Sequence, residues 1–307
     1  MKTGWLVNDC LTCIPGTKTI WHDLLENIPG LIDMCDARDQ WAALIGKINV
    51  ASSIAPPDYI IRNASYFPAL NTPGVKTVSL VQDIMHEGDF DIQKDVCDKS
   101  SVVVFNSPYT KEYAPKTNTK SVIIPLGTDF DLFRPIDKKC ELQEKWGIKS
   151  ESILFVGSAS WIKGYDILED LIKCSPDHNF VLVLKDEMTP TLPPNCKIFN
   201  LVTHEALTEI INACDLLVCT SRIETLHLAG IEAAACNLPL VVSDVGAYFG
   251  NLMVTPFGYL VRDGNFRHGI DHVLSSLYKY SPRQWFLDNG YDKQTCMNRW
   301  KELVENL

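Results

Sequence analysis

Two glutamates eight residues apart, Glu224 and Glu232, mark the stretch of this sequence best suited to chemistry. Glu224 falls in a predicted loop after the apolar run 216–220, and Glu232 falls inside a predicted helix over 228–236. A strand, a loop and a helix N-terminus together favour an anion such as a diphosphate, because free backbone N–H groups and the helix dipole point at the loop. The Glu232 carboxylate lies among alanines and needs a hydrogen-bonding partner. Ribose hydroxyls would serve, and a solvated helix face is the alternative.

A second loop, 157–164, follows the predicted strand 151–156 and leads into another helix. Its Lys163 precedes that helix, where a compact ammonium could neutralise a diphosphate. An ordinary surface lysine is the alternative interpretation. Together the two loops predict a site for a phosphorylated ligand.

The elements that position these loops alternate between apolar runs and segments of helical period, which is typical of an α/β protein with parallel sheets. One half of the chain contains predicted strands at 5–7, 58–61, 76–81, 101–105 and 121–124. The other contains 151–156, 180–184, 197–200, 216–220 and 240–243. We therefore expect two Rossmann-like, doubly wound halves. A charged, proline-containing stretch at 130–145 is the expected linker, and 291–307 is the expected final amphipathic helix.

Composition excludes several classes of partner. The chain has 307 residues and a formal net charge of -10, so nucleic acid and strong membrane binding are not expected. Its beginning lacks the pattern of a signal peptide and no apolar run reaches membrane-spanning length, so we expect a cytoplasmic protein. The eleven cysteines are expected to be reduced thiols, and the lone Cys10-x-x-Cys13 pair does not predict zinc.

Three segments, taken in order, resemble glycosyltransferase family 4. They are the E-x7-E stretch from Glu224 to Glu232 with the residues to Gly246, the segment 124–135 (IPLGTDFDLFRP), and the loop from Phe155 to Gly164. The resemblance implies a GT-B fold, with two Rossmann-like domains and a cleft between them. The implied domains are 1–135 on the acceptor side and 136–285 for the nucleotide sugar, with 286–307 as a helix returning to the first domain.

The resemblance also implies roles for individual residues. Lys163 would neutralise the donor diphosphate, Glu232 would hold the ribose, and Glu224 would lie near the transferred sugar. The remaining implied donor contacts are Gly16, Ser158 (where the family often has arginine), Val202 and Thr203 beside the base, and the backbone at Thr225 and Leu226. Members of the family commonly have a histidine at the end of the strand that here ends at Val81. This chain lacks a histidine at that point, and His86 is the candidate replacement.

The predicted reaction is the retaining transfer of a hexose from a nucleoside diphosphate sugar to an acceptor hydroxyl, without metal or other cofactor. The Asp89-Phe90-Asp91 and Asp129-Phe130-Asp131 stretches look like the DxD of a different glycosyltransferase fold, but their context favours solvated or capping aspartates. The acceptor could be a glycan, a lipid-linked molecule or a small molecule. Two alternatives remain open: a catalytically weak protein that binds sugar nucleotides, and a sugar-nucleotide epimerase of the same fold.

Overall fold

The computed structural model describes residues 2–7, 17–34, 48, 50–64, 69–84, 89–185 and 191–307. The chain forms two compact units: unit 1 is Met1–Gly127 with Gln294–Leu307, and unit 2 is Thr128–Lys293. The domain boundaries predicted from the sequence lie after residues 135 and 285. The structure instead keeps Thr128 with unit 2, because Thr128 forms a parallel bridge with Asp292.

Unit 1 is built on a parallel six-stranded sheet in the order β2-β1-β3-β4-β5-β6. The strands are β1 (Gly4–Val7), β2 (Leu31–Asp33), β3 (Tyr59–Asn63), β4 (Lys76–Val81), β5 (Val102–Phe105) and β6 (Ser121–Ile123). Strands β1, β3 and β5 are buried along their whole length, as expected for a parallel sheet covered on both faces. The strand order reverses between β1 and β3, and such a switch point commonly binds ligands in open α/β sheets.

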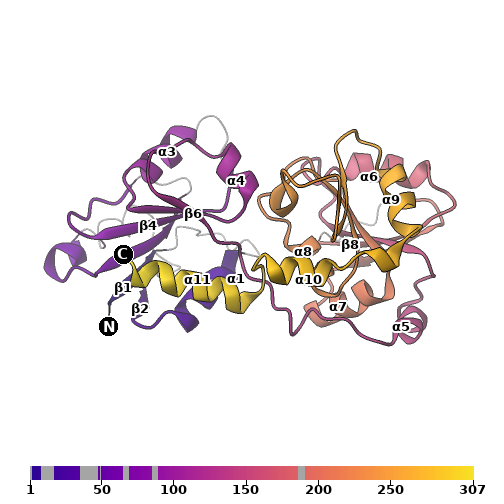
Figure 1. Cartoon of the computed structure of the whole chain (residues 1–307), viewed down its shortest axis with the longest axis horizontal. Helices are drawn as coiled ribbons and strands as arrows, with labels where there is room; N and C mark the ends of the chain where they lie inside the picture. The colour runs from indigo at the N-terminus through magenta and orange to yellow at the C-terminus, as the bar shows by residue number, and fades with distance from the viewer. Residues whose placement is uncertain are drawn as a thin grey trace. The chain divides into compact units, whose positions relative to one another are not determined.

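Helices cover both faces of this sheet, with α3 on one side and α1 and α11 on the other (Figure 1). Among the residues that the structure describes, unit 1 contains α1 (Thr17–Asn27), α3 (Phe90–Asp98), α4 (Pro108–Tyr113) and α11 (Lys293–Glu305), and residues 50–54 are also helical. Trp300 of α11 is fully buried, and Lys2 donates hydrogen bonds to the carbonyls of Val304 and Glu305. The last helix therefore packs within the same unit as the start of the chain.

Unit 2 contains a seven-stranded sheet in the order β12-β13-β11-β10-β7-β8-β9, in which only the β12–β13 pair is antiparallel. The strands are β7 (Ser152–Gly157), β8 (Asn179–Leu184), β9 (Cys196–Asn200), β10 (Leu216–Cys219), β11 (Leu240–Ser243), β12 (Val254–Thr255) and β13 (Gly258–Val261). Here the order reverses between β7 and β10, which are hydrogen-bonded neighbours. The loops that carry Lys163 and Glu224 leave these two strands.

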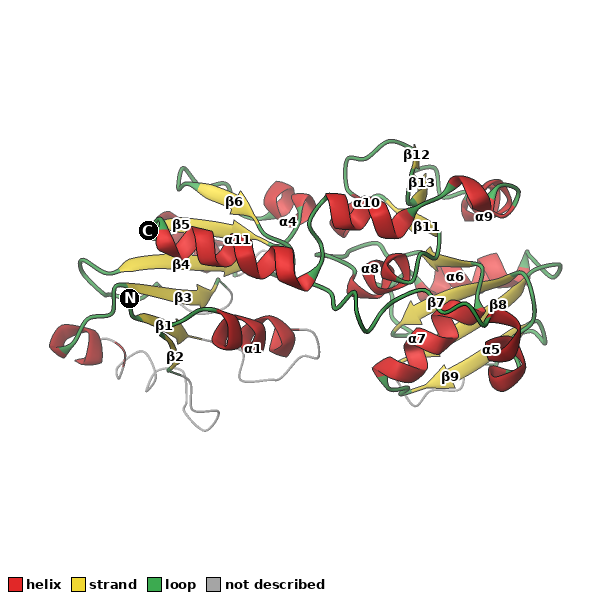
Figure 2. Cartoon of the chain, turned by 60° about the horizontal axis from the view of Figure 1, so that its bottom comes forward, coloured by secondary structure: helices red, strands yellow, loops and turns green. Residues whose placement is uncertain are grey.

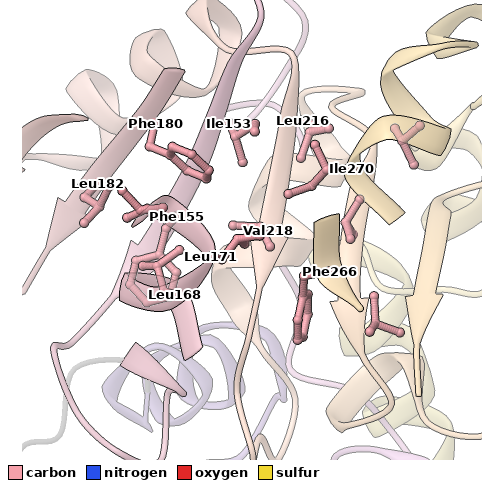
Figure 3. Packing of buried hydrophobic residues seen from close by; sticks show 14 of the residues in the cluster. Ile153, Phe155, Leu168, Leu171, Phe180, Leu182, Leu216, Val218, Phe266 and Ile270 are labelled. Carbon is pink, nitrogen blue, oxygen red and sulfur yellow. The ribbon is translucent and has the colours of Figure 1, made fainter. Parts of the chain in front are cut away.

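The helices of unit 2 are drawn around this sheet in Figure 2. They are α5 (Lys139–Trp146), α6 (Tyr165–Lys173), α7 (His204–Ala213), α8 (Leu228–Ala235), α9 (Phe266–Leu274) and α10 (Pro282–Asp288). Figure 3 shows alternate strand residues such as Phe155 and Val218 packing with Leu168 of α6 and Ile270 of α9. This core fixes the strands whose carboxyl ends support the candidate site.

Every strand predicted from the sequence is present, within one or two residues at each end. The expected linker over 130–145 is partly wrong, because its second half forms α5, and the predicted final helix begins only at Lys293. Strands β2, β12 and β13 and helices α9 and α10 were not predicted. No helix in the described ranges is long and apolar enough to cross a membrane. The eight cysteines within those ranges have free thiols.

Candidate functional site

The loops after β7 and β10 meet at the carboxyl end of the unit 2 sheet. The N–H of Arg222 donates to the carbonyl of Ile162 at 2.9 Å, which joins the two loops through their backbones. Lys163 Nζ lies 2.6 Å from Glu224 Oε1, and Ser221 Oγ donates to the same oxygen at 2.9 Å. The adjacency of β7 and β10 thus brings together two predicted residues that lie far apart in the sequence.

Glu224 is an ionised carboxylate in a nearly closed position, only 7% exposed. Burial opposes its ionisation, but the adjacent Lys163 ammonium and the Ser221 hydrogen bond outweigh burial and lower its pKa. The site therefore contains a preformed ion pair, with the ammonium of Lys163 on its more exposed side.

Helix α8 begins beside this ion pair without a side-chain cap. Its N-cap residue is His227, which makes no capping hydrogen bond. In the part of the chain that the structure describes, the N–H groups of Thr225 and Leu226 donate to no protein acceptor. Unsatisfied N–H groups at a helix N-terminus attract anions. This is the arrangement that the sequence predicted for a diphosphate.

His227 adopts a left-handed backbone conformation, with φ of 70°. Its Nδ1 lies 2.7 Å from the hydroxyl of Tyr248, and burial lowers its pKa to about 4, so the imidazole is neutral near pH 7. A Cβ on Gly230 would lie 1.8 Å from the Tyr248 hydroxyl and 2.5 Å from His227 Nδ1. The glycine thus leaves room for the His227–Tyr248 pair, a pair that the sequence analysis did not predict.

Glu232, one turn into α8, is half-buried. Its carboxylate accepts no hydrogen bond from the described residues. Burial raises its pKa to about 7, although the charge of Lys185, which follows β8, acts in the opposite direction. The carboxylate therefore lacks the partner that the sequence analysis required for it, and a ligand hydroxyl could supply one.

The other predicted donor contacts lie at the same edge of the sheet or outside the described residues. Ser158 follows β7, and its hydroxyl lies 3.0 Å from that of Ser160. Val202 and Thr203 follow β9, and the Thr203 hydroxyl caps α7 by accepting from the N–H of Ala206 at 3.3 Å. The Thr203 hydroxyl is thus engaged in the cap, and the backbone of this residue is what it offers beside a base. Gly16 and His86 lie outside the described residues.

Among the residues that the structure describes, Cys219, Glu224 and His227 form a possible metal-binding group, because each places one ligand atom within 4.8 Å of the others. All three are buried. Burial raises the pKa of the Cys219 thiol to about 12, and the Lys163 ammonium already contacts Glu224. A cation would have to displace that ammonium and deprotonate the thiol, so these residues fit an ion pair better than a metal.

Sequence analysis missed the contacts that fix the loop backbones. The Arg222 guanidinium pairs with Asp166 at 2.6 and 2.7 Å and lies 4.6 Å from the ring centre of Trp161. Gly164, with φ of 62°, packs where a Cβ would lie 2.0 Å from the carbonyl oxygen of Thr220. The one sequence signal for this close approach of the two loop backbones was the Lys163-Gly164 dipeptide before a predicted helix.

Comparisons with known proteins identify the fold. The fold is that of GT-B glycosyltransferases. Sucrose-phosphate synthase from Thermosynechococcus elongatus superposes with a TM-score of 0.77, at 15% identity, over 99% of each chain. The Anabaena protein HepE, in complex with UDP-glucose, gives 0.76 at 17% identity over the whole of both chains. The predicted fold class is confirmed.

The sequence of unit 2 matches a known family model. Residues 150–277 match the model described as "Glycosyl transferases group 1", the kind of family that the resemblance implied. An uncharacterized glycosyltransferase of Methanocaldococcus jannaschii is 26% identical over 200 residues, which cover 57% of this chain and 50% of that relative. The chain thus spans about half the length of this relative.

Proposed function

We propose that the protein is a retaining glycosyltransferase that transfers a hexose from a nucleoside diphosphate sugar to an acceptor hydroxyl without a metal ion. One observation carries the proposal: the uncapped start of α8 lies beside the ammonium of Lys163 and one turn before the unpartnered carboxylate of Glu232. N–H groups and an ammonium suit a diphosphate, and a carboxylate suits ribose hydroxyls. Unit 2 would bind the donor and unit 1 the acceptor.

In this reaction the bond between the anomeric carbon and the diphosphate oxygen breaks, and the nucleoside diphosphate leaves. The acceptor oxygen forms the new bond on the same face, and its proton passes to the departing diphosphate. Lys163 and the N-terminus of α8 would stabilise the charge that develops on the leaving group. Glu224 would contact the transferred sugar with its second carboxylate oxygen, Oε2, because Lys163 and Ser221 both contact Oε1.

The first donor to test is UDP-glucose, which is present in the HepE complex. Calorimetry with UDP-, GDP- and ADP-sugars should show that one nucleotide binds, and NMR of the product should show the anomeric configuration of the donor. Product of inverted configuration would refute retention. Binding without transfer or hydrolysis of any donor would support the catalytically weak sugar-nucleotide protein instead.

We further propose that the enzyme acts in the cytoplasm. The reducing conditions of that compartment keep thiols such as those of Cys214 and Cys219 free. Fractionation of cells that produce the protein, followed by immunoblotting, tests this placement. Recovery of the protein with an oxidising compartment would refute it.

A further inference from the structure

Two histidines lie one turn apart on α9 of unit 2. His268 and His272 are four residues apart in the chain, so their side chains lie on the same face of the helix. The centres of the two rings are 6.3 Å apart, with an angle of 45° between the ring planes. His268 is exposed and His272 is half-buried, so an ion in solution can reach the pair. Because imidazole is the commonest metal ligand among side chains, the pair is a candidate metal site.

The sheet beneath α9 restricts where the two rings can lie. Both rings pack near the ring of Tyr259 on β13, with centre-to-centre distances of 5.8 Å for His268 and 5.3 Å for His272. Tyr259 is 5% exposed. A Cβ on Gly269, which follows the first histidine, would lie 3.0 Å from the Tyr259 ring and 2.9 Å from Val241. The glycine therefore lets α9 approach the sheet closely, and the buried tyrosine supports both imidazoles.

Neither imidazole is engaged elsewhere in the part of the chain that the structure describes. Within that part, the side chains of His268 and His272 form no hydrogen bond and no ion pair. The carboxylate of Asp271, which lies between them in the sequence, has other partners: His178 Nε2 at 2.9 Å and Arg267 Nε at 3.0 Å. The ring nitrogens of the pair are therefore available to a ligand.

The chemistry of the pair selects the class of metal ion. Imidazole nitrogen suits copper, nickel and zinc, whereas magnesium and calcium prefer oxygen ligands. Metal–nitrogen bonds of about 2 Å would place the ring centres roughly 5 Å apart, so rotation of the side chains must bring the rings about 1 Å closer. Among the first-row divalent ions, Cu²⁺ binds nitrogen ligands most tightly, and its tetragonal geometry accepts two adjacent imidazoles together with water. Zn²⁺ usually takes three or four protein ligands, so two imidazoles hold it less tightly.

We propose that His268 and His272 form a two-histidine site that binds Cu²⁺. The proposal does not depend on the glycosyltransferase function, because neither histidine belongs to the candidate site described above. Once one imidazole holds the ion, the second acts as an intramolecular ligand at high effective concentration. Loss of either histidine should therefore remove most of the affinity.

Calorimetry with the Cu²⁺ complex of iminodiacetate tests the site, because this chelator leaves coordination positions for two imidazoles. Accessible thiols are first alkylated, since cysteine also binds copper. We expect one tight site per unaltered chain, and binding at least tenfold weaker in His268→Gln and in His272→Gln. His204→Gln, which removes an exposed histidine of α7, is the matched control and should bind as tightly as the unaltered protein. Unchanged binding in either α9 variant, or an equal loss in all three variants, would overturn the proposal.

Electron paramagnetic resonance of the bound Cu²⁺ identifies its ligands and separates coordination from a loss of folding. The unaltered protein should show coupling to nitrogens of two imidazoles, and His268→Gln at saturating probe should show coupling to one. Coupling to a single imidazole in the unaltered protein would overturn the proposal. Equimolar Zn²⁺ should leave the copper signal unchanged, because copper binds imidazole more tightly. Displacement of copper by zinc would also show that the proposed site is wrong.

Discussion

The ammonium of Lys163 and the carboxylate of Glu224 lie 2.6 Å apart, although 61 residues separate them in the chain. Glu224 is 7% exposed and the Lys163 side chain is 31% exposed, so the carboxylate is enclosed and the ammonium faces outward. The pair keeps a buried carboxylate ionised and holds a positive charge beside the start of α8. A diphosphate bound there would share the ammonium with Glu224.

Removal of Lys163 should weaken donor binding. For Lys163→Ala we expect a loss of about 1.5–3 kcal/mol in the free energy of donor binding, the usual contribution of a hydrogen bond to a charged group. Calorimetry with the preferred nucleotide sugar measures it. Lys173→Ala, which removes an exposed lysine at the end of α6, is the control and should bind normally. Unchanged affinity in Lys163→Ala would rule out the proposed role.

The same variant leaves Glu224 buried without its cation, so the melting temperature should also fall at pH 7. Because the pKa of Glu224 is lowered in the folded protein, its ionisation stabilises the fold above the pKa of the unfolded chain, and this contribution disappears as the pH falls. The difference in melting temperature between the wild type and Lys163→Ala should therefore narrow as the pH is lowered from 7 through the acidic range. A difference that does not change with pH would point to packing instead of charge.

Donor binding should strengthen between pH 6 and pH 8 through Glu232. Its pKa is raised to about 7, so about a tenth of the molecules carry the carboxylate at pH 6 and about nine tenths at pH 8. If the ribose binds only the ionised form, affinity for the nucleotide sugar rises roughly ninefold. A nucleotide sugar is required as the probe, because a terminal phosphate itself titrates near pH 6.

Glu232→Gln is the test of that assignment. It should abolish the pH dependence and raise the dissociation constant at pH 8 roughly tenfold, since charge-assisted hydrogen bonds are about twice as strong as neutral ones. The pKa of Glu232 is higher in the folded protein than in the unfolded chain. The fold therefore loses stability when the pH rises above the pKa that this glutamate has in the unfolded chain. The melting temperature of the unliganded variant at pH 8 should therefore not fall. A drop in stability with unchanged affinity would mark a structural glutamate.

Activity should not depend on a metal ion. We expect full transfer in EDTA, because Lys163 and the N-terminus of α8 supply the positive field at the leaving group. Zinc is the metal to test, because Cys219, Glu224 and His227 place ligand atoms within 4.8 Å of one another. Micromolar zinc should neither activate the protein nor raise its melting temperature. If EDTA abolishes activity and manganese restores it, the metal-free mechanism is wrong.

Gly230→Ala should destabilise the protein, although alanine is the better helix former by about 1 kcal/mol. The new Cβ would lie 1.8 Å from the Tyr248 hydroxyl, and overpacking of this kind costs about 1–3 kcal/mol. Chemical denaturation measures the free energy of unfolding. Combining the change with Tyr248→Phe, which removes the hydroxyl, should recover part of the loss. If the two losses in the free energy of unfolding simply add, the new methyl group does not clash with the Tyr248 hydroxyl.

Much of the architecture is determined locally, and so could be predicted from the sequence. Runs such as 76–81 and 240–243 are rich in β-branched and other apolar residues, and they form β4 and β11 over those residues. The E-x7-E stretch likewise predicted a strand, a loop and a helix, because hydrophobic period and length are properties of a short segment. The short edge strands β2 and β12 carry little such signal, and they were missed.

Only the tertiary structure decided which predicted residues act together. Lys163 meets Glu224 because β7 and β10 are neighbours in a sheet whose order does not follow the chain. The same packing lowers the pKa of His227 and raises that of Glu232. Burial and charge depend on what surrounds a side chain in space. A sequence pattern can name the residue type, but it cannot supply those surroundings.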